Sequence, residues 1–245
     1  MSKITLKDLN VIYQNNDLKT IALNEVNLEF ADGLFNVIVG FSGSGKTTLL
    51  KAIAGVVLYS GQIYFDDCEI SNKLIKDRNI SYVTQEFALY PHFTIYDNIA
   101  FPLKLAKLSR SEIDKAVREI ARELDLEACL SRKPKHLSIG QCQRVAIARS
   151  LVKKPAVLLM DEPLSNLDPT LKQSIKLLLK KTLAKMKITT IYVTHDFLDA
   201  MSLADQLYVL RDGKIVLSGN PLDIYNSDNE EIKYLKESIV ADGIN

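Results

Sequence analysis

The sequence lacks the features of a membrane, secreted or low-complexity chain. Its longest apolar run, counting glycine, extends only from Ala52 to Tyr59, whereas a membrane-spanning helix needs about 20 apolar residues. The N-terminal segment MSKITLKDLN contains no apolar signal-peptide region, so we expect the chain to stay in the cytosol. Glycine and proline are scarce, at 10 and 7 of 245 residues, which argues against collagenous or disordered structure.

An excess of charge of one sign is also absent. The chain has 31 Lys and Arg against 30 Asp and Glu, a formal net charge of +1. We therefore expect no nucleic-acid partner, and any attraction to polyanions must be local. The three cysteines form no CxxC pair and have no histidine at metal-ligand spacing, which predicts reduced thiols in a reducing compartment. They are Cys68, Cys129 and Cys142.

Strand and helix patterns alternate on both sides of a helix-rich middle segment. Alternating apolar residues predict half-buried strands within the first thirty residues, and a buried strand over 35–39 precedes a helix over 46–54. Further strands are expected at 63–65, 80–83, 156–160, 191–193 and 206–210, with a hairpin turn at 211–214. This order predicts an α/β fold with a mainly parallel sheet and an inserted helical subdomain.

Two helices are expected in the middle segment. Residues 111–126 carry apolar side chains every three or four positions, with Ser111 and Asp114 as a capping box. A second helix is expected from about Gly140 to Lys153. A further helix follows Asp168 as N-cap, with Pro169 at its first position, where the missing N–H costs little.

A glycine-rich loop stands where the buried strand over 35–39 gives way to a helix. It fits the pattern GxxxxGK[ST], whose backbone N–H groups and following helix N-terminus hold phosphates. The alternative is a glycine-rich turn with a solvated lysine, but the flanking strand and helix favour phosphate binding. Lys46 is expected to contact the β- and γ-phosphates and Thr47 to ligate magnesium. The loop residues are Gly40, Phe41, Ser42, Gly43, Ser44, Gly45, Lys46 and Thr47.

Two adjacent carboxylates follow the expected strand over 156–160. An acidic residue at the end of a buried parallel strand lies at the crevice where open α/β sheets bind ligands. Asp161 is therefore expected to hold magnesium, and Glu162 is free to polarise a water molecule. By themselves, these two carboxylates are explained equally well as the solvent-exposed end of a strand and as a functional site. Together with the phosphate loop they indicate a site of nucleotide hydrolysis.

The segment Leu137–Gln141 precedes the second expected helix of the middle segment. Ser138 suits the N-cap position, and capping alone would explain it. The same helix end is an anion site, because its first N–H groups have no partner within the helix. One nucleotide does not need two phosphate-binding helix ends, so this end is expected to serve a nucleotide held by another subunit.

In this order and spacing, the three motifs resemble those of ABC transporter ATP-binding subunits, and the resemblance covers nearly the whole chain. It adds a D-loop at 165–168, a histidine switch at His195, a Q-loop glutamine at Gln85 and an aromatic residue, Tyr13, that stacks on adenine. Taken alone, His195 would be explained as a histidine packed in the core, and Tyr13 as a tyrosine packed at the end of a strand.

The resemblance implies a P-loop NTPase fold with an N-terminal antiparallel β subdomain. The ATPase domain is expected over residues 1–230, with the helical subdomain inserted at about 86–153, and a C-terminal tail over 231–245. ATP and Mg²⁺ are the implied ligands, bound by the loop, by Thr48 beside it, by Tyr13 and by Asp161. Glu162 is the implied general base, His195 the γ-phosphate contact, and Gln85 the residue that senses magnesium and the attacking water.

The resemblance also implies a head-to-tail homodimer or heterodimer with two ATP molecules between the subunits. Ser138, Gly140 and Gln141 would act on the γ-phosphate of the partner's ATP, and Asp168 would communicate across the dimer. Two positions depart from the family pattern: Ile139 stands where glycine is common and Cys142 where glutamine is frequent. Neither change removes a catalytic group, although Ile139 could restrict the approach of the partner's nucleotide.

Residues 82–103 resemble the same region of importer ATPases, especially of the carbohydrate type. This implies transmembrane permease subunits as partners, with a solute-binding protein as a further one, and a peripheral location on the cytoplasmic face of the membrane. Those ATPases continue into a regulatory β domain after a segment like 221–225, and we expect none here. The alternatives are a soluble ABC ATPase of DNA repair or translation and a regulatory protein that binds ATP without turnover. Glu162 and His195 argue against the latter.

Overall fold

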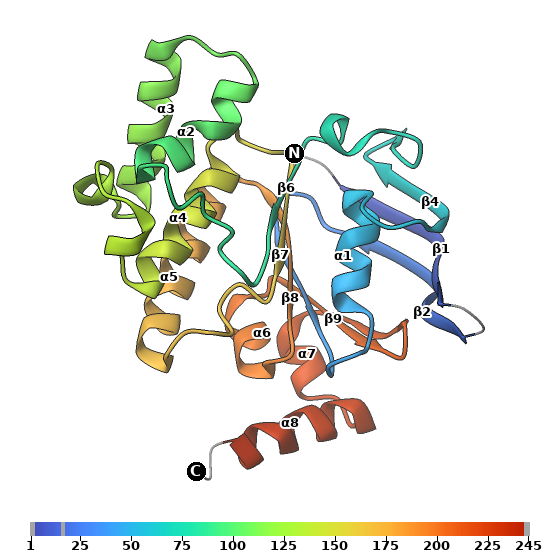
Figure 1. Cartoon of the computed structure of the whole chain (residues 1–245). Coiled ribbons are helices and arrows are strands. Elements are labelled where there is room, and N and C mark those ends of the chain that lie inside the picture. Colours follow the sequence, from blue (N-terminus) through green and yellow to red (C-terminus); the bar gives the residue numbers. More distant parts are fainter. Residues whose placement is uncertain (1–2, 16–17, 243–245) are drawn as a thin grey trace.

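The computed structural model describes residues 3–15 and 18–242, and its described part contains two β-sheets (Figure 1). The larger sheet has the strand order β10-β9-β3-β8-β7-β6. Its strands from β9 to β6 run parallel, and β10 pairs antiparallel with β9. The strands are β3 (Phe35–Val39), β6 (Ile80–Val83), β7 (Val157–Asp161), β8 (Thr189–Thr194), β9 (Gln206–Arg211) and β10 (Lys214–Gly219).

The smaller sheet is antiparallel, with the order β2-β1-β4-β5. Its strands are β1 (Ile4–Asn15), β2 (Leu18–Phe30), β4 (Ser60–Phe65) and β5 (Cys68–Glu69). Apolar residues on one face, such as Leu23, Val26 and Phe30 of β2, are buried. They share a core cluster with helix α1 (Lys46–Ala54) and with residues of the larger sheet. This packing fixes the start of α1 between the two sheets.

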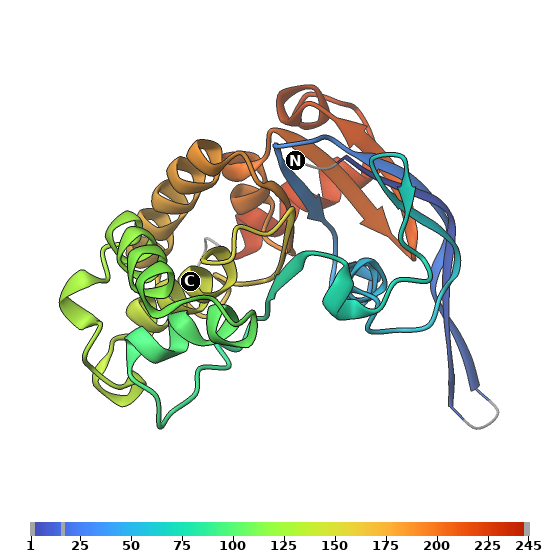
Figure 2. The same cartoon turned by 90° about the horizontal axis from the view of Figure 1, so that it is seen from above.

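Three helices lie between β6 and β7 and form the lobe at the left of Figure 1. They are α2 (Ile95–Leu105), α3 (Arg110–Glu123) and α4 (Ile139–Leu151), with short 3₁₀ turns at Glu127–Cys129 and Pro134–His136. Another 3₁₀ turn, Ile75–Asp77, precedes β6. Figure 2 shows this lobe set apart from the antiparallel sheet. The helical insertion was predicted as part of the fold class, and its three helices lie between Ile95 and Leu151.

The capping box of α3 was predicted at the wrong residues. Ser109, not Ser111, is the N-cap: its hydroxyl accepts from the Glu112 N–H, and Glu112 Oε2 accepts from the Ser109 N–H. Glutamate is long enough to reach back to the N-cap backbone. Asp114 instead pairs with Arg118 one turn later on the helix surface. The helix therefore begins two positions earlier than the predicted cap required.

Among the residues described after β7, there are four helices: α5 (Pro169–Met186), α6 (Phe197–Leu203), α7 (Pro221–Tyr225) and α8 (Glu230–Asp242). The sequence presents the last segment as a charged tail, but the structure forms a helix there. Ile232 and Leu235, three positions apart on one face of α8, are buried in the main core. Residues 243–245 of the expected tail lie outside the described residues.

The fold class was predicted correctly: a mainly parallel core sheet, an N-terminal antiparallel sheet and an inserted helical lobe. The strands at 35–39 and 80–83 and the helix at 46–54 have the predicted bounds. The turn at 211–214 joins β9 and β10, with positive φ at Asp212 and Gly213 as a tight hairpin requires. Within the described ranges, no helix has both the length and the apolar character that crossing a bilayer demands.

Candidate functional site

The predicted phosphate loop, carboxylates, Gln85 and His195 gather at the carboxyl ends of the parallel strands. The phosphate loop follows β3, His195 follows β8, Asp161 ends β7, and Gln85 comes two residues after β6. These four strands are neighbours in the order β3-β8-β7-β6 and run parallel. Their carboxyl ends therefore meet, which is where open α/β sheets bind ligands.

A cavity of about 520 Å³ opens at this edge. It brings together the loop, both carboxylates after β7 and Gln85, which were predicted from three distant parts of the sequence. Its described lining residues are Thr20, Ile21, Ala22, Ser42, Gly43, Gly45, Lys46, Thr47, Thr48, Gln85, Asp161 and Glu162. The lining from β2, at 20–22, was not predicted, because only the tertiary fold lays that strand beside the loop.

Two glycines of the loop cannot be replaced without displacing backbone. A Cβ on Gly40 would lie 2.2 Å from the Leu210 carbonyl oxygen, and one on Gly45 would lie 2.5 Å from the Ala22 carbonyl oxygen. Gly45 also has φ +105°, which side chains disfavour. The loop is thus held tightly between β9 and β2, so its N–H groups keep fixed directions.

The Lys46 side chain is buried against the first residues of the phosphate loop. Its ammonium group donates to the carbonyl oxygens of Gly40 and Phe41 at 2.7 and 2.8 Å. Burial lowers the pKa of Lys46, although the nearby Glu162 and Asp161 carboxylates act in the opposite direction. A lysine ammonium has three N–H donors, so the two contacts with the loop do not exhaust it. Lys46 therefore places a positive charge in the lining of the cavity, next to the phosphate loop.

Thr47 and Asp161 are in direct contact in the lining of the cavity. The Thr47 hydroxyl donates to Asp161 Oδ1 at 2.9 Å, and the Tyr82 hydroxyl donates to Asp161 Oδ2 at 2.9 Å. Burial and the Asp161 carboxylate raise the pKa of Tyr82 far above its ordinary value, so Tyr82 stays a donor. Tyr82 was not predicted as a site residue. Its position on β6, the strand beside β7, is the signal that would have found it once the strand order was known.

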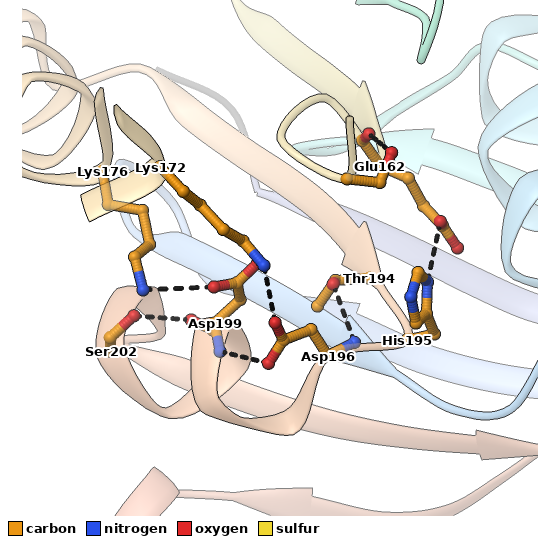
Figure 3. A network of polar contacts seen from close by, with 9 residues as sticks. Glu162, Lys172, Lys176, Thr194, His195, Asp196, Asp199 and Ser202 are labelled. Carbon is orange, nitrogen blue, oxygen red and sulfur yellow. Dashed lines mark hydrogen bonds and ion pairs between the residues drawn. The ribbon is translucent and has the colours of Figure 1, made fainter. Parts of the chain in front are cut away.

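Glu162 and His195 are in direct contact. His195 Nδ1 lies 2.8 Å from Glu162 Oε2 (Figure 3). Glu162 has φ +45°, a costly conformation for a residue with a side chain. Its N–H donates to the Val193 carbonyl oxygen of β8, and its carbonyl oxygen accepts from the Ser165 hydroxyl. The main chain thus turns sharply after β7, directing the carboxylate toward the end of β8.

The expected adenine-contacting residue lies close to the first turn of α1. The Tyr13 hydroxyl is 3.4 Å from the Thr48 hydroxyl, and Tyr13 is 41% exposed. An exposed aromatic ring beside a phosphate loop suits a base-stacking role. This role stays a prediction.

The predicted residues at the start of α4 and α5 do not line the cavity. Ser138 and Gln141 form a capping box: the Ser138 hydroxyl accepts from the Gln141 N–H, and Gln141 Oε1 accepts from the Ser138 N–H. Gly140 is buried against Leu171 of α5, and Ile139 beside it is 57% exposed. Asp168 caps α5 by accepting from the Leu171 N–H. These side chains therefore make local contacts within the chain.

A strand–loop–helix cradle with an acidic strand end opposite is the arrangement of P-loop nucleotide-binding proteins. The family model described as "ABC transporter" matches residues 23–165. This match covers more than half of the chain, and the chain belongs to that family.

Two curated relatives extend the match over most of the chain. A trehalose/maltose import ATP-binding protein, MalK of Thermococcus litoralis, is 50% identical over 212 residues, which are 84% of this chain and 57% of the relative. An sn-glycerol-3-phosphate import ATP-binding protein, UgpC of Psychromonas ingrahamii, is 43% identical over 93% of this chain and 60% of the relative. The chain therefore spans less than two thirds of the length of these relatives.

A solved structure confirms the fold. The dimeric post-hydrolysis state of the ATP-binding cassette MJ0796, bound to ADP and Pi, superposes with a TM-score of 0.79 and 33% identity. The match covers 89% of this chain and 98% of the cassette. The predicted family and fold class are thus confirmed.

Proposed function

We propose that this chain is the ATP-binding and ATP-hydrolysing subunit of an ABC transporter that imports a solute. The observation that carries the proposal is the convergence of Lys46, the Thr47–Asp161 pair and Glu162 on one cavity. These groups supply a cation for phosphates, oxygen ligands for a metal and a carboxylate for a water molecule. They come from two strand ends, those of β3 and β7, which lie more than a hundred positions apart in the sequence, so their convergence has no purely local explanation.

ATP would lie with its phosphates in the loop, held by backbone N–H groups and Lys46, and with its base against Tyr13. The residues fit Mg²⁺, because hard cations prefer oxygen ligands and Thr47 Oγ1 and Asp161 Oδ1 already lie 2.9 Å apart. Gln85 lines the same cavity, and its side-chain oxygen would be a third ligand. When bound, Mg²⁺ would neutralise charge on the phosphate oxygens.

Glu162 would be the general base and His195 the contact to the γ-phosphate. The Glu162 carboxylate lines the cavity, and its hydrogen bond to His195 holds the imidazole at the same edge of the sheet. A carboxylate in this position can accept a proton from an attacking water molecule. The contact between the two side chains links the base to the group that would touch the phosphate.

A second ATP-binding subunit would complete the site, in a homodimer or a heterodimer. The dimeric cassette bound to ADP and Pi supports this arrangement. Ser138, Gly140, Gln141 and Asp168 would face the nucleotide of the partner. The N-terminus of α4, where the exposed Ile139 follows the capping serine, is suited to an anion brought by another chain.

Transmembrane permease subunits would be the membrane partners, so that the chain acts peripherally on the cytoplasmic face. The names of the two relatives, which are import ATP-binding proteins, support this direction of transport. An aromatic cluster of Tyr90, Phe93 and Phe101, with Tyr90 37% exposed, offers a docking surface in the 82–103 segment. A solute-binding protein would deliver the solute. One relative is named for import of trehalose and maltose and the other for import of sn-glycerol-3-phosphate, so we propose no particular solute.

The Glu162→Gln variant tests this function. Glutamine keeps the size of the side chain and loses only the base, so ATP hydrolysis should fall by roughly 10²- to 10⁴-fold while ATP binding stays intact. ATP should also hold this variant as a dimer in size-exclusion chromatography. Rapid hydrolysis by Glu162→Gln would remove Glu162 from the role of base. If neither the wild-type chain nor its complex with a permease hydrolyses ATP, the ATPase proposal is wrong.

A further inference from the structure

Four charged side chains form an ion-pair cluster between α5 and α6, next to His195 (Figure 3). Lys172 Nζ lies 2.5 Å from Asp196 Oδ2 and 2.7 Å from Asp199 Oδ2. Lys176 Nζ lies 3.1 Å from Asp199 Oδ1. Lys172 therefore bridges both carboxylates, whereas Lys176 contacts one. The cluster was not predicted from the sequence, because its lysines lie at least twenty positions from its aspartates.

Three of the four side chains in the cluster are largely removed from water. The Asp199 side chain is 4% exposed, that of Lys176 12% and that of Lys172 18%, whereas that of Asp196 is 33% exposed. A buried ion pair is weak evidence for stability, because losing hydration offsets much of the attraction between the charges. Such a pair does impose geometry, because a buried charge has few alternative partners. The cluster is therefore better explained by what it positions than by the stability that it adds.

The cluster positions Asp196, the residue that follows His195 in the chain. The Asp196 N–H donates to the Thr194 hydroxyl at 3.0 Å, and Asp196 Oδ1 accepts from the Asp199 N–H at 3.0 Å as the N-cap of α6. Its second carboxylate oxygen, Oδ2, is the one that Lys172 binds. Burial by itself would raise the pKa of Asp196, but the hydrogen bonds from Lys172 and from two backbone N–H groups, together with the charge of Lys172, outweigh burial and lower the pKa. The backbone beside His195 is thus held from three sides.

Lys172 also connects this loop to the start of α5. Its N–H donates to the Asp168 carbonyl oxygen at 2.9 Å, so Lys172 lies one turn after the capping residue of α5. A shift of the first turn of α5 would move the Lys172 ammonium group and the carboxylate that it holds. His195 would follow, since Asp196 is its direct neighbour in the chain.

We infer that Lys172 is a positioning residue for His195, holding the histidine loop through Asp196 and linking it to the first turn of α5. The inference rests on the proposed function, in which His195 contacts the γ-phosphate. Lys176 provides a matched control: it comes from the same helix, has similar burial and binds the same Asp199, yet it does not contact Asp196.

The first test is steady-state ATP hydrolysis by the purified chain. Lys172→Met should lower kcat roughly tenfold and leave KM for ATP within about twofold, because a small misplacement of a phosphate-contacting group affects the chemical step. Lys176→Met should stay within about twofold of wild type in both constants. Lys172→Arg, which keeps the charge and can bind two carboxylates, should restore most of kcat. Equal losses in Lys172→Met and Lys176→Met would overturn the inference.

The second test needs no turnover. The chain has only three histidines, so the imidazole signals of His195 can be assigned by NMR with the His195→Ala variant. Those signals should shift in Lys172→Met and stay unchanged in Lys176→Met. Thermal unfolding of both variants identifies a temperature at which each is folded. Unchanged His195 signals in folded Lys172→Met would overturn the inference.

The same variants separate this inference from the proposed function. If His195→Ala retains full hydrolysis, the proposed role of His195 is wrong. If His195→Ala is inactive while Lys172→Met keeps wild-type kcat, only the positioning role of Lys172 is wrong. In a double-mutant cycle, the kcat of Lys172→Met combined with Asp196→Asn should be no lower than that of the more severe single change, because both changes remove the Lys172–Asp196 contact.

Discussion

The cavity at the sheet edge and the start of α4 both carry predicted phosphate-binding residues, yet they are built differently. In the cavity, Thr47 bonds Asp161 across 114 positions and Glu162 bonds His195 across 33. At the start of α4, Ser138 and Gln141 bond each other three positions apart. The cavity is assembled by the sheet, whereas the helix end is formed by its own sequence.

This difference matters for how each region would meet a nucleotide. In the proposed function, the cavity would surround ATP with a cation, a pair of metal ligands and a base from one chain. The helix end offers the capping hydroxyl of Ser138 beside the exposed residue Ile139, and neither residue is among those that line the cavity. The first region should therefore govern binding of ATP, and the second should govern what happens when another subunit arrives.

Lys46→Ala should cause the largest change in ATP binding. Hydrogen bonds from a charged group contribute about 1.5–3 kcal/mol, so affinity should fall roughly 10- to 100-fold, measured by isothermal titration calorimetry on the monomer. Lys51→Ala, on the same helix but outside the cavity lining, is the control and should bind as wild type. Unchanged affinity in Lys46→Ala would contradict the assignment of the cavity as the phosphate cradle.

Ser138→Asp tests the other region. Aspartate caps a helix as well as serine does, so folding should be preserved, but its negative charge would repel a phosphate. ATP affinity of the monomer should not change, while ATP-dependent dimerisation and hydrolysis should fall by about tenfold. Ser138→Asn keeps the cap without the charge and should be affected less. A loss of monomer affinity in Ser138→Asp would show that the two regions are not separate.

Tyr82→Phe should have a smaller effect, confined to the cavity. It removes one of the two hydroxyl donors to Asp161, so hydrolysis should need about threefold more Mg²⁺, measured by titrating the metal at saturating ATP. Tyr208→Phe removes a buried hydroxyl that donates to the Glu29 carbonyl oxygen, away from the cavity. If both variants change the Mg²⁺ requirement equally, Tyr82 has no special relation to the metal site.

The smallest effect is expected from pH. Because the pKa of Asp196 is lowered in the folded chain, its ionised form adds stability above the ordinary aspartate pKa of about 4, and this stability is lost as pH falls through the lowered pKa. The free energy of unfolding of wild type should therefore exceed that of Asp196→Asn at pH 6, and the difference should shrink toward pH 3.5. Urea unfolding at each pH measures it. A constant difference would contradict the ion pair with Lys172.

Much of the fold was predictable because its signals are local. The strand at 35–39 is apolar throughout and the helix after it starts at the GKT sequence, so both bounds were correct. The capping box of α3 was misplaced because two serines, 109 and 111, compete within one turn and only Glu112 reaches back. The helix at 230–242 was missed because its two buried residues gain their partners only in the folded core.

The sequence by itself determined the family, the phosphate loop, the two carboxylates after β7 and the capping serine of α4. Each of these lies in a short segment whose chemistry depends on neighbours in the chain. Only the tertiary structure decided that Tyr82 donates to Asp161, that Glu162 contacts His195 and that Lys172 binds Asp196. Those contacts depend on which strands and helices lie side by side, because long-range pairing arises from packing of the whole core.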